Sequence, residues 1–245
     1  MLPGLGAKVN IKVSFTANYG RGRVGAAQPG QYRVESLAMG NRATPEQLAQ
    51  LQPIVDRLAA CTALDATGQP RALGTELARG ATLVMFVRQF GCIGCHQQMT
   101  LATPLLGEVA EYGVRSIVIG CGPSDYLPAF LAEYHLAEKG VMVLTDPSLR
   151  CFDAAALRRS FWDAWGPRGG WDFLAAAARG YALRGFWGNT GQHGGTLLID
   201  GPAAEQRLRF HYSNSHLTDM APLHEVMEAS ALWLAKQMQS TAGGS

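Results

Sequence analysis

Three short, continuously apolar segments, separated by sequence of helical period, constrain the fold of this 245-residue chain most strongly. The segments are TLVMFVRQF at 82–90, VRSIVIG at 114–120 and VMVLTDP at 141–147. Continuous apolarity over so few residues is typical of strands buried on both faces. The resulting order of strand, helix, strand, helix, strand predicts an α/β fold, with helices covering both faces of a largely parallel sheet.

The flanking sequence completes the expected domain. Thr44 and Pro45 mark a helix start, and apolar residues at helical spacing predict one helix from there to about Cys61. The polar stretch 65–81 is expected to form a hairpin or loop. Residues 194–213 form two apolar runs around a Gly-Pro turn, which predicts an antiparallel hairpin. A last amphipathic helix is expected from residue 219 or 222 to about 238.

These patterns divide the chain into one domain with extensions. We expect the domain over 44–240, an insertion within it over 152–192, and a short tail over 241–245. Residues 1–43 are rich in Gly, Arg and polar residues without a clear period, so we expect an N-terminal extension that is extended or poorly ordered.

Composition and charge exclude several classes of function. The net charge is +2 and no run of basic residues concentrates it, which argues against nucleic-acid binding. No apolar run approaches the roughly 20 residues needed to span a bilayer. The N-terminus has no apolar segment of signal-peptide length, so we expect a cytoplasmic protein with reduced thiols.

The strongest chemical signal is the Cys92-Ile-Gly-Cys95 motif, directly after the first buried strand and at the start of a predicted helix. A helix N-terminus offers N–H groups and a positive dipole end that stabilise a thiolate. A thiolate is the species that attacks a disulfide or peroxide, so the motif predicts a redox-active dithiol. A zinc site would need two further ligands at matching spacing, and we therefore expect no metal. The position nearer the helix start nominates Cys92 as the attacking thiol and Cys95 as the resolving one.

Other residues are candidates for the same site. Arg88 could reach the pair and lower a thiolate pKa through its charge, or it could be an ordinary surface arginine beside a strand. His96 could exchange protons near the pair or face solvent. Cys121 and Cys151 follow the second and third strands and are candidate accessory thiols, although the sequence favours a small buried hydrophobe at each position.

The segment 152–192 has its own aromatic-rich composition, and two short helices are expected in it around residues 166–170. It could roof an apolar substrate pocket, form a dimer or partner surface, or pack on the sheet as a satellite core. Its arginines also leave membrane-surface binding open. The candidate substrate-binding residues in and after this segment are Trp162, Trp165, Trp187, Gly194 and Gly195.

Four segments carry a family resemblance: FVRQFGCIGCHQQM, VIGCGPSDYLPAF, VLTDPSLRCF and GNTGQHGGTLLID. In order and spacing they resemble the AhpC/TSA peroxiredoxin superfamily, most closely its peroxiredoxin-like 2 branch, which includes the prostamide/prostaglandin F synthases. The resemblance covers roughly residues 44–238. It implies a three-layer thioredoxin-like fold of the peroxiredoxin type and a thiol-based reductase. The family's Arg ahead of Gly-Cys-x-x-Cys maps onto Arg88, and its two cysteines map onto Cys92 and Cys95.

The chain also departs from the typical peroxiredoxin pattern. The Thr and the peroxidatic Cys of the usual Pro-x-x-x-Thr-x-x-Cys loop align with Cys92 and Cys95, so on this alignment Cys95 would attack first. The loop proline is missing. Gly194 and Gly195 stand where thioredoxins have a cis-proline or peroxiredoxins an arginine. Ordinary high-rate peroxidase activity is therefore not expected.

The combined prediction is a peroxiredoxin-like thiol oxidoreductase with an antioxidant role. It would use the dithiol to reduce a peroxide, an endoperoxide or a disulfide, with a bulky apolar substrate favoured. An external thiol reductant such as thioredoxin or glutathione would regenerate it without a metal or organic cofactor. Two alternatives stay open, a tailoring enzyme of small-molecule biosynthesis and a redox-regulated binding protein without turnover. A homodimer is also compatible with the sequence.

Overall fold

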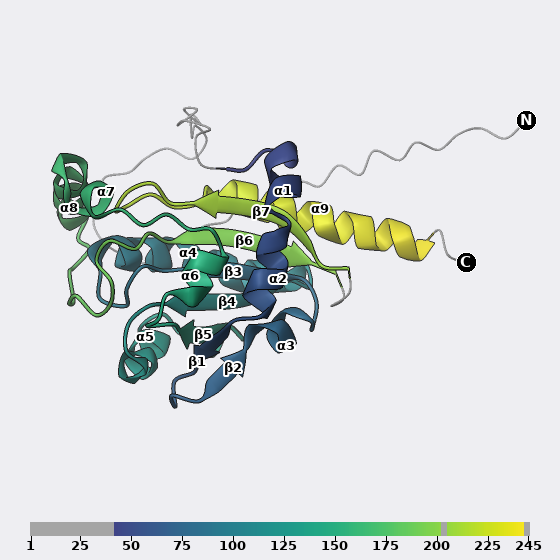
Figure 1. Ribbon diagram of the computed structural model, residues 1–245, viewed down its shortest axis with the longest axis horizontal. Helices are drawn as coiled ribbons and strands as arrows, with labels where there is room; N and C mark the ends of the chain where they lie inside the picture. Colours follow the sequence, from purple (N-terminus) through teal and green to yellow (C-terminus); the bar gives the residue numbers. More distant parts are fainter. Residues whose placement is uncertain (1–41, 202–204, 243–245) are drawn as a thin grey trace, which may run out of the picture. The chain divides into compact units, whose positions relative to one another are not determined.

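The computed structural model describes residues 42–201 and 205–242, and a seven-stranded mixed sheet runs through them (Figure 1). Its strand order is β2-β1-β5-β4-β3-β6-β7. The strands are β1 (Thr62–Leu64), β2 (Pro70–Ala72), β3 (Thr82–Phe86), β4 (Arg115–Gly120), β5 (Met142–Thr145), β6 (Gly195–Asp200) and β7 (Arg207–Ser213). Strands β3, β4 and β5 are parallel, while β6 runs antiparallel to β3. The predicted α/β class is confirmed.

Nine α-helices and one 3-10 turn surround the sheet in the described residues. The helices are α1 (Pro45–Leu51), α2 (Pro53–Ala59), α3 (Leu73–Leu77), α4 (Ile93–Glu111), α5 (Leu127–Glu133), α6 (Arg150–Ala154), α7 (Phe161–Trp165), α8 (Pro167–Ala178) and α9 (Leu223–Ala242), and the turn is η1 (Ser124–Tyr126). None of these helices is long and apolar enough to cross a membrane.

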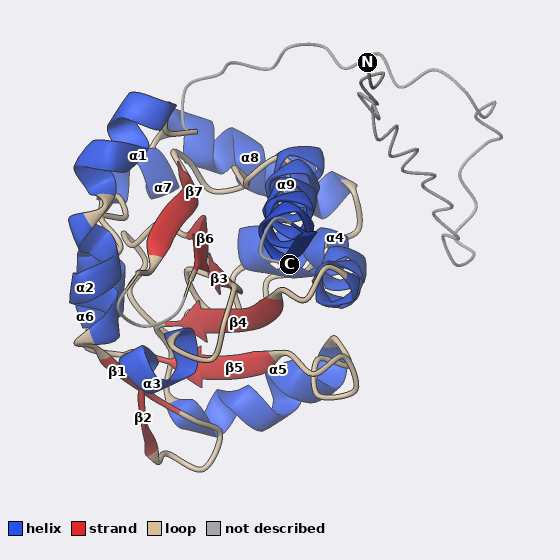
Figure 2. Cartoon of the chain, turned by 90° about the vertical axis from the view of Figure 1, so that its right-hand side faces the viewer, coloured by secondary structure: helices blue, strands red, loops and turns tan. Residues whose placement is uncertain are grey.

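Helices cover both faces of the sheet, because alternate side chains of each strand point to opposite sides. In β3, Leu83 and Met85 pack with residues of α4 and α9, whereas Val84 and Phe86 pack with residues of α2 and α6. Figure 2 shows α4 and α9 on one side of the sheet and α2 and α6 on the other. Burial on both sides explains why the strand sequences are apolar throughout rather than alternating.

The single helix expected from Thr44 to about Cys61 is wrong, since two helices, α1 and α2, occupy this stretch. Thr44 does cap the first one: its hydroxyl accepts from the Gln47 N–H at 3.3 Å, and the Gln47 side chain accepts from the Thr44 N–H at 2.8 Å. The break falls at Pro53, which has no N–H to continue the helical ladder and whose ring clashes with the preceding turn.

The hairpin expected over 194–213 forms, since β6 pairs antiparallel with β7. In the stretch 65–81, expected as a hairpin or loop, the chain turns back so that β2 pairs antiparallel with β1, and it then forms helix α3, which was not expected. The first buried segment is a strand only to Phe86; the Val87 N–H still donates to the Ile119 carbonyl at 2.9 Å, and residues 88–92 then leave the sheet. Helix α9 runs to Ala242, past the expected end near residue 238. The extension expected over 1–43 lies outside the described residues apart from positions 42 and 43, as does the tail beyond 242.

The aromatic-rich insertion supplies α7 and α8, which lie together at one end of the sheet (Figure 1). After α8 the chain continues without helix or strand through residues 181–190, which we call the strap. The strap crosses the loop ahead of α4, because the N–H groups of Arg184 and Gly185 donate to the Gly91 carbonyl at 2.8 and 3.2 Å. The fold thereby places part of the insertion directly beside the Cys-x-x-Cys motif.

Candidate active site

Cys92 occupies the N-cap position of α4, in extended backbone conformation, and its side chain is only 3% exposed. Arg88, four residues earlier, donates from Nη2 to Cys92 Sγ at 2.9 Å. Arg88 is itself 4% exposed, so the charge acts at close range with little screening by water. The structure therefore brings the predicted arginine and the first cysteine into direct contact.

Cys95 lies one helical turn further on, and it is also buried. Its sulfur accepts from the backbone N–H of Gln89 at 3.3 Å. Residues 88–92 thus bend back over the start of α4, so that both sulfurs are held by the same loop. The Gln89 side chain is fully buried, and its amide atoms have no hydrogen-bond partner among the described residues.

The pKa values of the two thiols shift in opposite directions. A hydrogen bond from the Cys95 thiol, together with the adjacent Arg88 guanidinium, outweighs burial and lowers the pKa of Cys92 to about 5. Burial raises the pKa of Cys95 well above the ordinary thiol value, and the neighbouring Cys92 sulfur raises it further. At neutral pH this pair consists of a Cys92 thiolate and a protonated Cys95.

Arg88 is held on its other side by the insertion and the strap. Its Nη1 donates to the Thr190 carbonyl at 3.2 Å. The indole N–H of Trp165, in α7, donates to the same carbonyl, also at 3.2 Å. The Trp165 ring lies 6.0 Å from the guanidinium carbon and packs on Phe186 of the strap, with ring centres 5.4 Å apart.

The strap also packs on helix α5 and on the turn before it. Trp187 stacks on Tyr126 with ring centres 4.0 Å apart, and Arg184 forms an ion pair with Glu133 at 2.6 Å. The approach at the motif is close: a Cβ on Gly91 would lie 2.6 Å from the Gly185 carbonyl oxygen. The strap therefore contributes to the burial of this site.

His96 does not contact either sulfur by its side chain. Its Nδ1 hydrogen-bonds the Tyr134 hydroxyl, and the ring lies against Tyr181 of the strap. Glu133 is 3.4 Å from the same nitrogen. Burial lowers the pKa of His96, which favours the neutral ring. It occupies a polar cluster beside the motif rather than the solvent-facing position that was one of the two alternatives.

The two candidate accessory thiols lie in different surroundings. Cys121 donates to the Arg88 carbonyl at 2.8 Å and accepts from the Asn189 N–H at 3.3 Å, so it is part of the wall around Arg88. Burial raises its pKa to about 11. Cys151 is instead a residue of α6, buried in the core against α2, where it hydrogen-bonds the thiol of Cys61. All five cysteines of the chain are described by the structure, and each is a free thiol.

The candidate substrate-binding residues are also spread over several positions. Trp165 and Trp187 line the neighbourhood of the motif as described above, whereas Trp162 is 77% exposed. At Gly194 and Gly195, the backbone packs closely against neighbouring groups near the carboxyl end of β3. A Cβ on Gly194 would lie 2.4 Å from the Phe86 carbonyl oxygen, and one on Gly195 would meet Leu157 at 2.4 Å.

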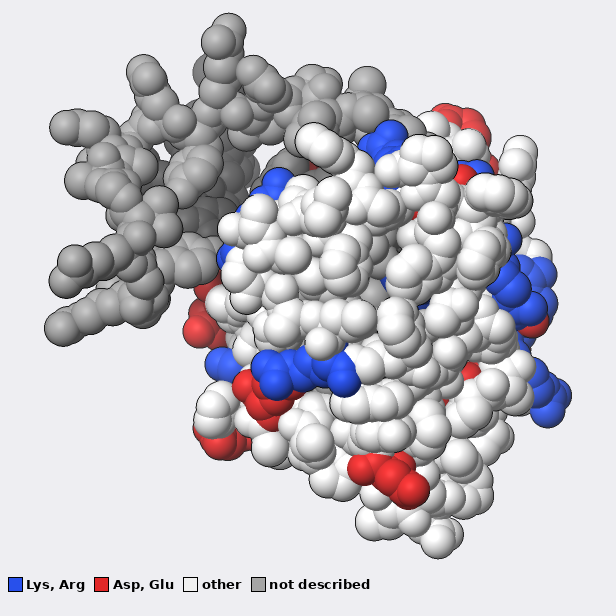
Figure 3. All heavy atoms as spheres, turned by 90° about the vertical axis from the view of Figure 1, so that its left-hand side faces the viewer, with Lys and Arg blue, Asp and Glu red and all other residues white. Residues whose placement is uncertain are grey.

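Apolar side chains are exposed on the insertion and the strap. The large ones are Phe161, Trp162, Trp171, Leu174, Leu183 and Phe186. Figure 3 views the molecule from the side on which α7 and α8 lie, and uncharged atoms form most of that face. An apolar surface thus adjoins the site.

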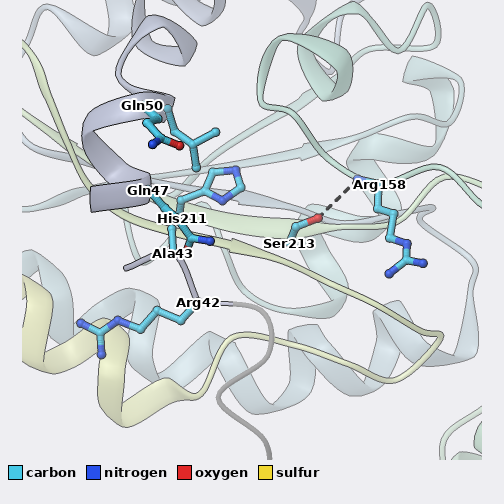
Figure 4. Close-up of a pocket in the computed structure, with 8 residues that line it drawn as sticks. Arg42, Ala43, Gln47, Gln50, Arg158, His211 and Ser213 are labelled. Carbon is cyan, nitrogen blue, oxygen red and sulfur yellow. Dashed lines mark hydrogen bonds between the residues drawn. The ribbon is translucent and has the colours of Figure 1, made fainter. Parts of the chain in front are cut away.

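A separate pocket of about 360 Å³ lies between α1, the end of β7 and the start of the insertion (Figure 4). It is lined by Arg42, Ala43, Gln47, Gln50, Leu51, Arg158, His211 and Ser213. His211 donates from Nε2 to the Ala155 carbonyl at 2.9 Å, and burial lowers its pKa. Neither motif cysteine lines this pocket, so it is separate from the surroundings of the motif.

The structure adds partners that the sequence did not identify. Thr190 and Gln89 contribute through backbone groups, and backbone contacts leave no residue-type signal in a sequence. Glu133 is the last residue of α5, and Tyr134 directly follows it. Within residues 42–201 and 205–242, no group of three or more His, Cys, Asp or Glu side chains is arranged to hold a metal ion.

No protein-family model matches the chain. Among curated proteins, peroxiredoxin-like 2C of Bos taurus is 26% identical over 215 residues, which cover 82% of this chain and 92% of that protein. This similarity confirms the resemblance that the sequence motifs indicated.

Similar solved structures include peroxidoxin BcpB from Mycobacterium tuberculosis, with 17% identity, a TM-score of 0.46, and coverage of 70% of this chain and 89% of that one. The Xanthomonas campestris bacterioferritin comigratory protein has 12% identity, a TM-score of 0.48, and coverage of 74% and 94%.

Proposed function

Because the chain is similar to peroxiredoxin-like 2C and resembles the AhpC/TSA peroxiredoxin superfamily, we propose that it is a thiol-dependent oxidoreductase in which Cys92 attacks and Cys95 resolves. The contact between Arg88 Nη2 and Cys92 Sγ at 2.9 Å carries this proposal. Together with the hydrogen bond from the Cys95 thiol, which is the larger cause, this contact lowers the pKa of Cys92, whereas burial and the neighbouring Cys92 sulfur raise the pKa of Cys95. The order of attack is the one favoured by the helix-start argument, rather than the one implied by the peroxiredoxin loop alignment.

The proposed reaction with a peroxide has two steps. With a hydroperoxide, the Cys92 thiolate attacks the oxygen that carries the hydrogen, and the O–O bond breaks. Cys92 becomes a sulfenic acid, and the leaving alkoxide takes a proton from water and departs as an alcohol. Cys95 sulfur then attacks the Cys92 sulfur, and the Cys95 proton leaves with the hydroxyl group as water. The product is a Cys92–Cys95 disulfide, and an external dithiol reduces it back to two thiols.

A disulfide substrate would use the same residues. The Cys92 thiolate would displace one sulfur of the substrate to form a mixed disulfide, and Cys95 would then release the second sulfur as a thiol. The apolar surface of the insertion and strap supports a bulky apolar substrate in either case. No metal or organic cofactor takes part in this scheme.

Stopped-flow oxidation of the reduced protein tests the proposal. Hydrogen peroxide, cumene hydroperoxide and oxidised glutathione serve as oxidants, and Cys92→Ser and Cys95→Ser are compared separately. We expect Cys92→Ser to lower the rate of oxidation by at least about a hundredfold, since it removes the nucleophile. Cys95→Ser should still react once and keep a sulfenic acid that dimedone traps, without forming the disulfide.

Three results would contradict parts of this scheme. Loss of the first oxidation step in Cys95→Ser, but not in Cys92→Ser, would reverse the order of attack. If neither substitution changed the reaction with any oxidant, the enzyme proposal would fail. A disulfide that forms but is never turned over by thioredoxin or glutathione would favour the redox-regulated binding protein.

A further inference from the structure

The Thr190 carbonyl is shared by two donors from different parts of the chain. Arg88 reaches it from the loop after β3, and Trp165 reaches it from the insertion, each at 3.2 Å. The Trp165 ring also lies at 6.0 Å from the guanidinium carbon, which is the range of a cation–π contact. Trp165 therefore meets Arg88 both through its ring face and through a common hydrogen-bond acceptor.

Arg88 depends on such contacts for its orientation. It forms no ion pair with a carboxylate within the described ranges, although its side chain is 4% exposed. A buried guanidinium without an acidic partner is expensive unless its donors are satisfied. The partners that hold its Nη atoms are the Thr190 carbonyl and the Cys92 sulfur.

We propose that Trp165 is a positioning residue for the thiol reaction: it holds Arg88 against Cys92 and keeps water away from that contact. This inference rests on the proposed function, because it assigns the insertion a role in activating the same thiolate. It differs from a substrate-binding role, since Trp165 acts on Arg88 and does not need to touch the substrate.

Backbone pairing explains how a helix of the insertion can hold this position. The Ser160 N–H, at the start of α7, donates to the Gly191 carbonyl at 2.8 Å, and the His193 N–H donates to the Arg158 carbonyl at 3.0 Å. The start of α7 is thus tied to the residues that directly follow Thr190. These two backbone hydrogen bonds therefore hold the helix that carries Trp165 close to the Thr190 carbonyl.

The test measures the pH dependence of Cys92 alkylation by iodoacetamide in the reduced full-length protein, with mass spectrometry of the peptide that contains Cys92. In the unsubstituted protein we expect a midpoint near the Cys92 pKa of about 5. Trp165→Leu should move this midpoint upward by about one pH unit, because it weakens a charge interaction of the kind that shifts pKa values by 1–3. Trp165→Phe keeps a ring face but loses the N–H donor, and it should fall between the two.

Two controls separate positioning from general damage. Trp162→Leu changes a tryptophan of the same helix that is 77% exposed, and it should leave the midpoint unchanged. In an Arg88→Gln background, Trp165→Leu should produce no further shift, because the residue through which it acts is gone. Thermal melting of each variant shows whether the fold persists, and Trp165→Phe carries the test if Trp165→Leu does not fold.

The outcomes distinguish this inference from the proposed function. A low midpoint in the unsubstituted protein that stays unchanged in Trp165→Leu and Trp165→Phe overturns the role of Trp165 and leaves the proposed function intact. An equal upward shift in Trp162→Leu overturns it as well. A midpoint near the ordinary thiol value of about 8.5 in the unsubstituted protein overturns the proposed function, and the positioning role with it.

Discussion

At the residue scale, the two motif cysteines differ in the groups that surround each sulfur. Arg88 contacts the Cys92 sulfur, whereas Cys95 receives a backbone N–H and donates its own proton toward Cys92. Each additional donor to Cys92 stabilises negative charge there and makes a second thiolate beside it costly. A Cys-x-x-Cys spacing allows this difference: the hydrogen bond from the Cys95 thiol and then the Arg88 guanidinium lower the pKa of Cys92, whereas burial raises the pKa of Cys95.

The same contrast predicts selective chemistry among the five cysteines. At pH 7, native protein treated briefly with iodoacetamide should be labelled almost entirely at Cys92. The reason is that burial raises the pKa values of the thiols outside the motif, at positions 61, 121 and 151, as well as that of Cys95. Peptide mass spectrometry measures the site, and labelling in denaturant should reach all five thiols. Prominent native labelling of Cys121 or Cys95 would contradict this assignment.

At the element scale, the two helices of the insertion, α7 and α8, pack closely against each other, and this packing bears on the position of Trp165. Gly169, in the first turn of α8, is buried against α7: a Cβ there would lie 2.0 Å from the Ala164 carbonyl oxygen. Ala164 is the residue before Trp165. The packing of these two helices therefore bears directly on where the Trp165 ring lies.

Two adjacent glycines of α8 provide a matched pair for stability measurements. Gly169→Ala should lower the free energy of unfolding by about 1–3 kcal/mol, because the added methyl group meets a backbone carbonyl. Gly170→Ala should raise it by about 0.5–1 kcal/mol, because a Cβ at this exposed helical position meets nothing within 4 Å and alanine is the better helix former. Urea unfolding measures both, and the same sign for both substitutions would contradict this packing.

At the scale of the whole molecule, the site couples to folding stability through the charge of Cys92. The pKa of Cys92 is about 5 in the folded protein and about 8.5 in an unfolded chain. A depressed value means that the ionised form favours folding. This contribution is fully present above about pH 8.5, decreases as the pH falls, and is lost once the pH passes through about 5.

The lowered pKa of Cys92 also predicts the reduction potential of the Cys92–Cys95 disulfide. A stabilised thiolate favours the reduced state, so the Cys92–Cys95 disulfide should be more oxidising than that of thioredoxin, with a potential between about −270 and about −120 mV. Equilibration with glutathione buffers at pH 7 measures it. Arg88→Gln should move the potential toward more negative values, since it removes the charge that stabilises the thiolate. A potential below that of thioredoxin in the unsubstituted protein would contradict the lowered pKa of Cys92.

Much of the fold was predictable because burial on both faces leaves a strong pattern in sequence. The runs that became β3, β4 and β5 are apolar throughout, and the dithiol stands out by its spacing and by its place after a strand. The break between α1 and α2 was missed, although Pro53 provided a local signal for it. The strap and its contacts with the Gly91 carbonyl had no such signal, because they join backbone groups about ninety residues apart.

The sequence by itself determined the layered α/β architecture and the pair of cysteines at a helix start, since both depend on local periodicity and spacing. Only the tertiary structure decided the contacts among Arg88, Trp165 and Thr190, and the contact of Arg88 with the Cys92 sulfur, which helps to lower the pKa of Cys92. Side-chain acidity depends on distances of a few ångströms between segments that are remote in the chain, and no local pattern encodes such distances.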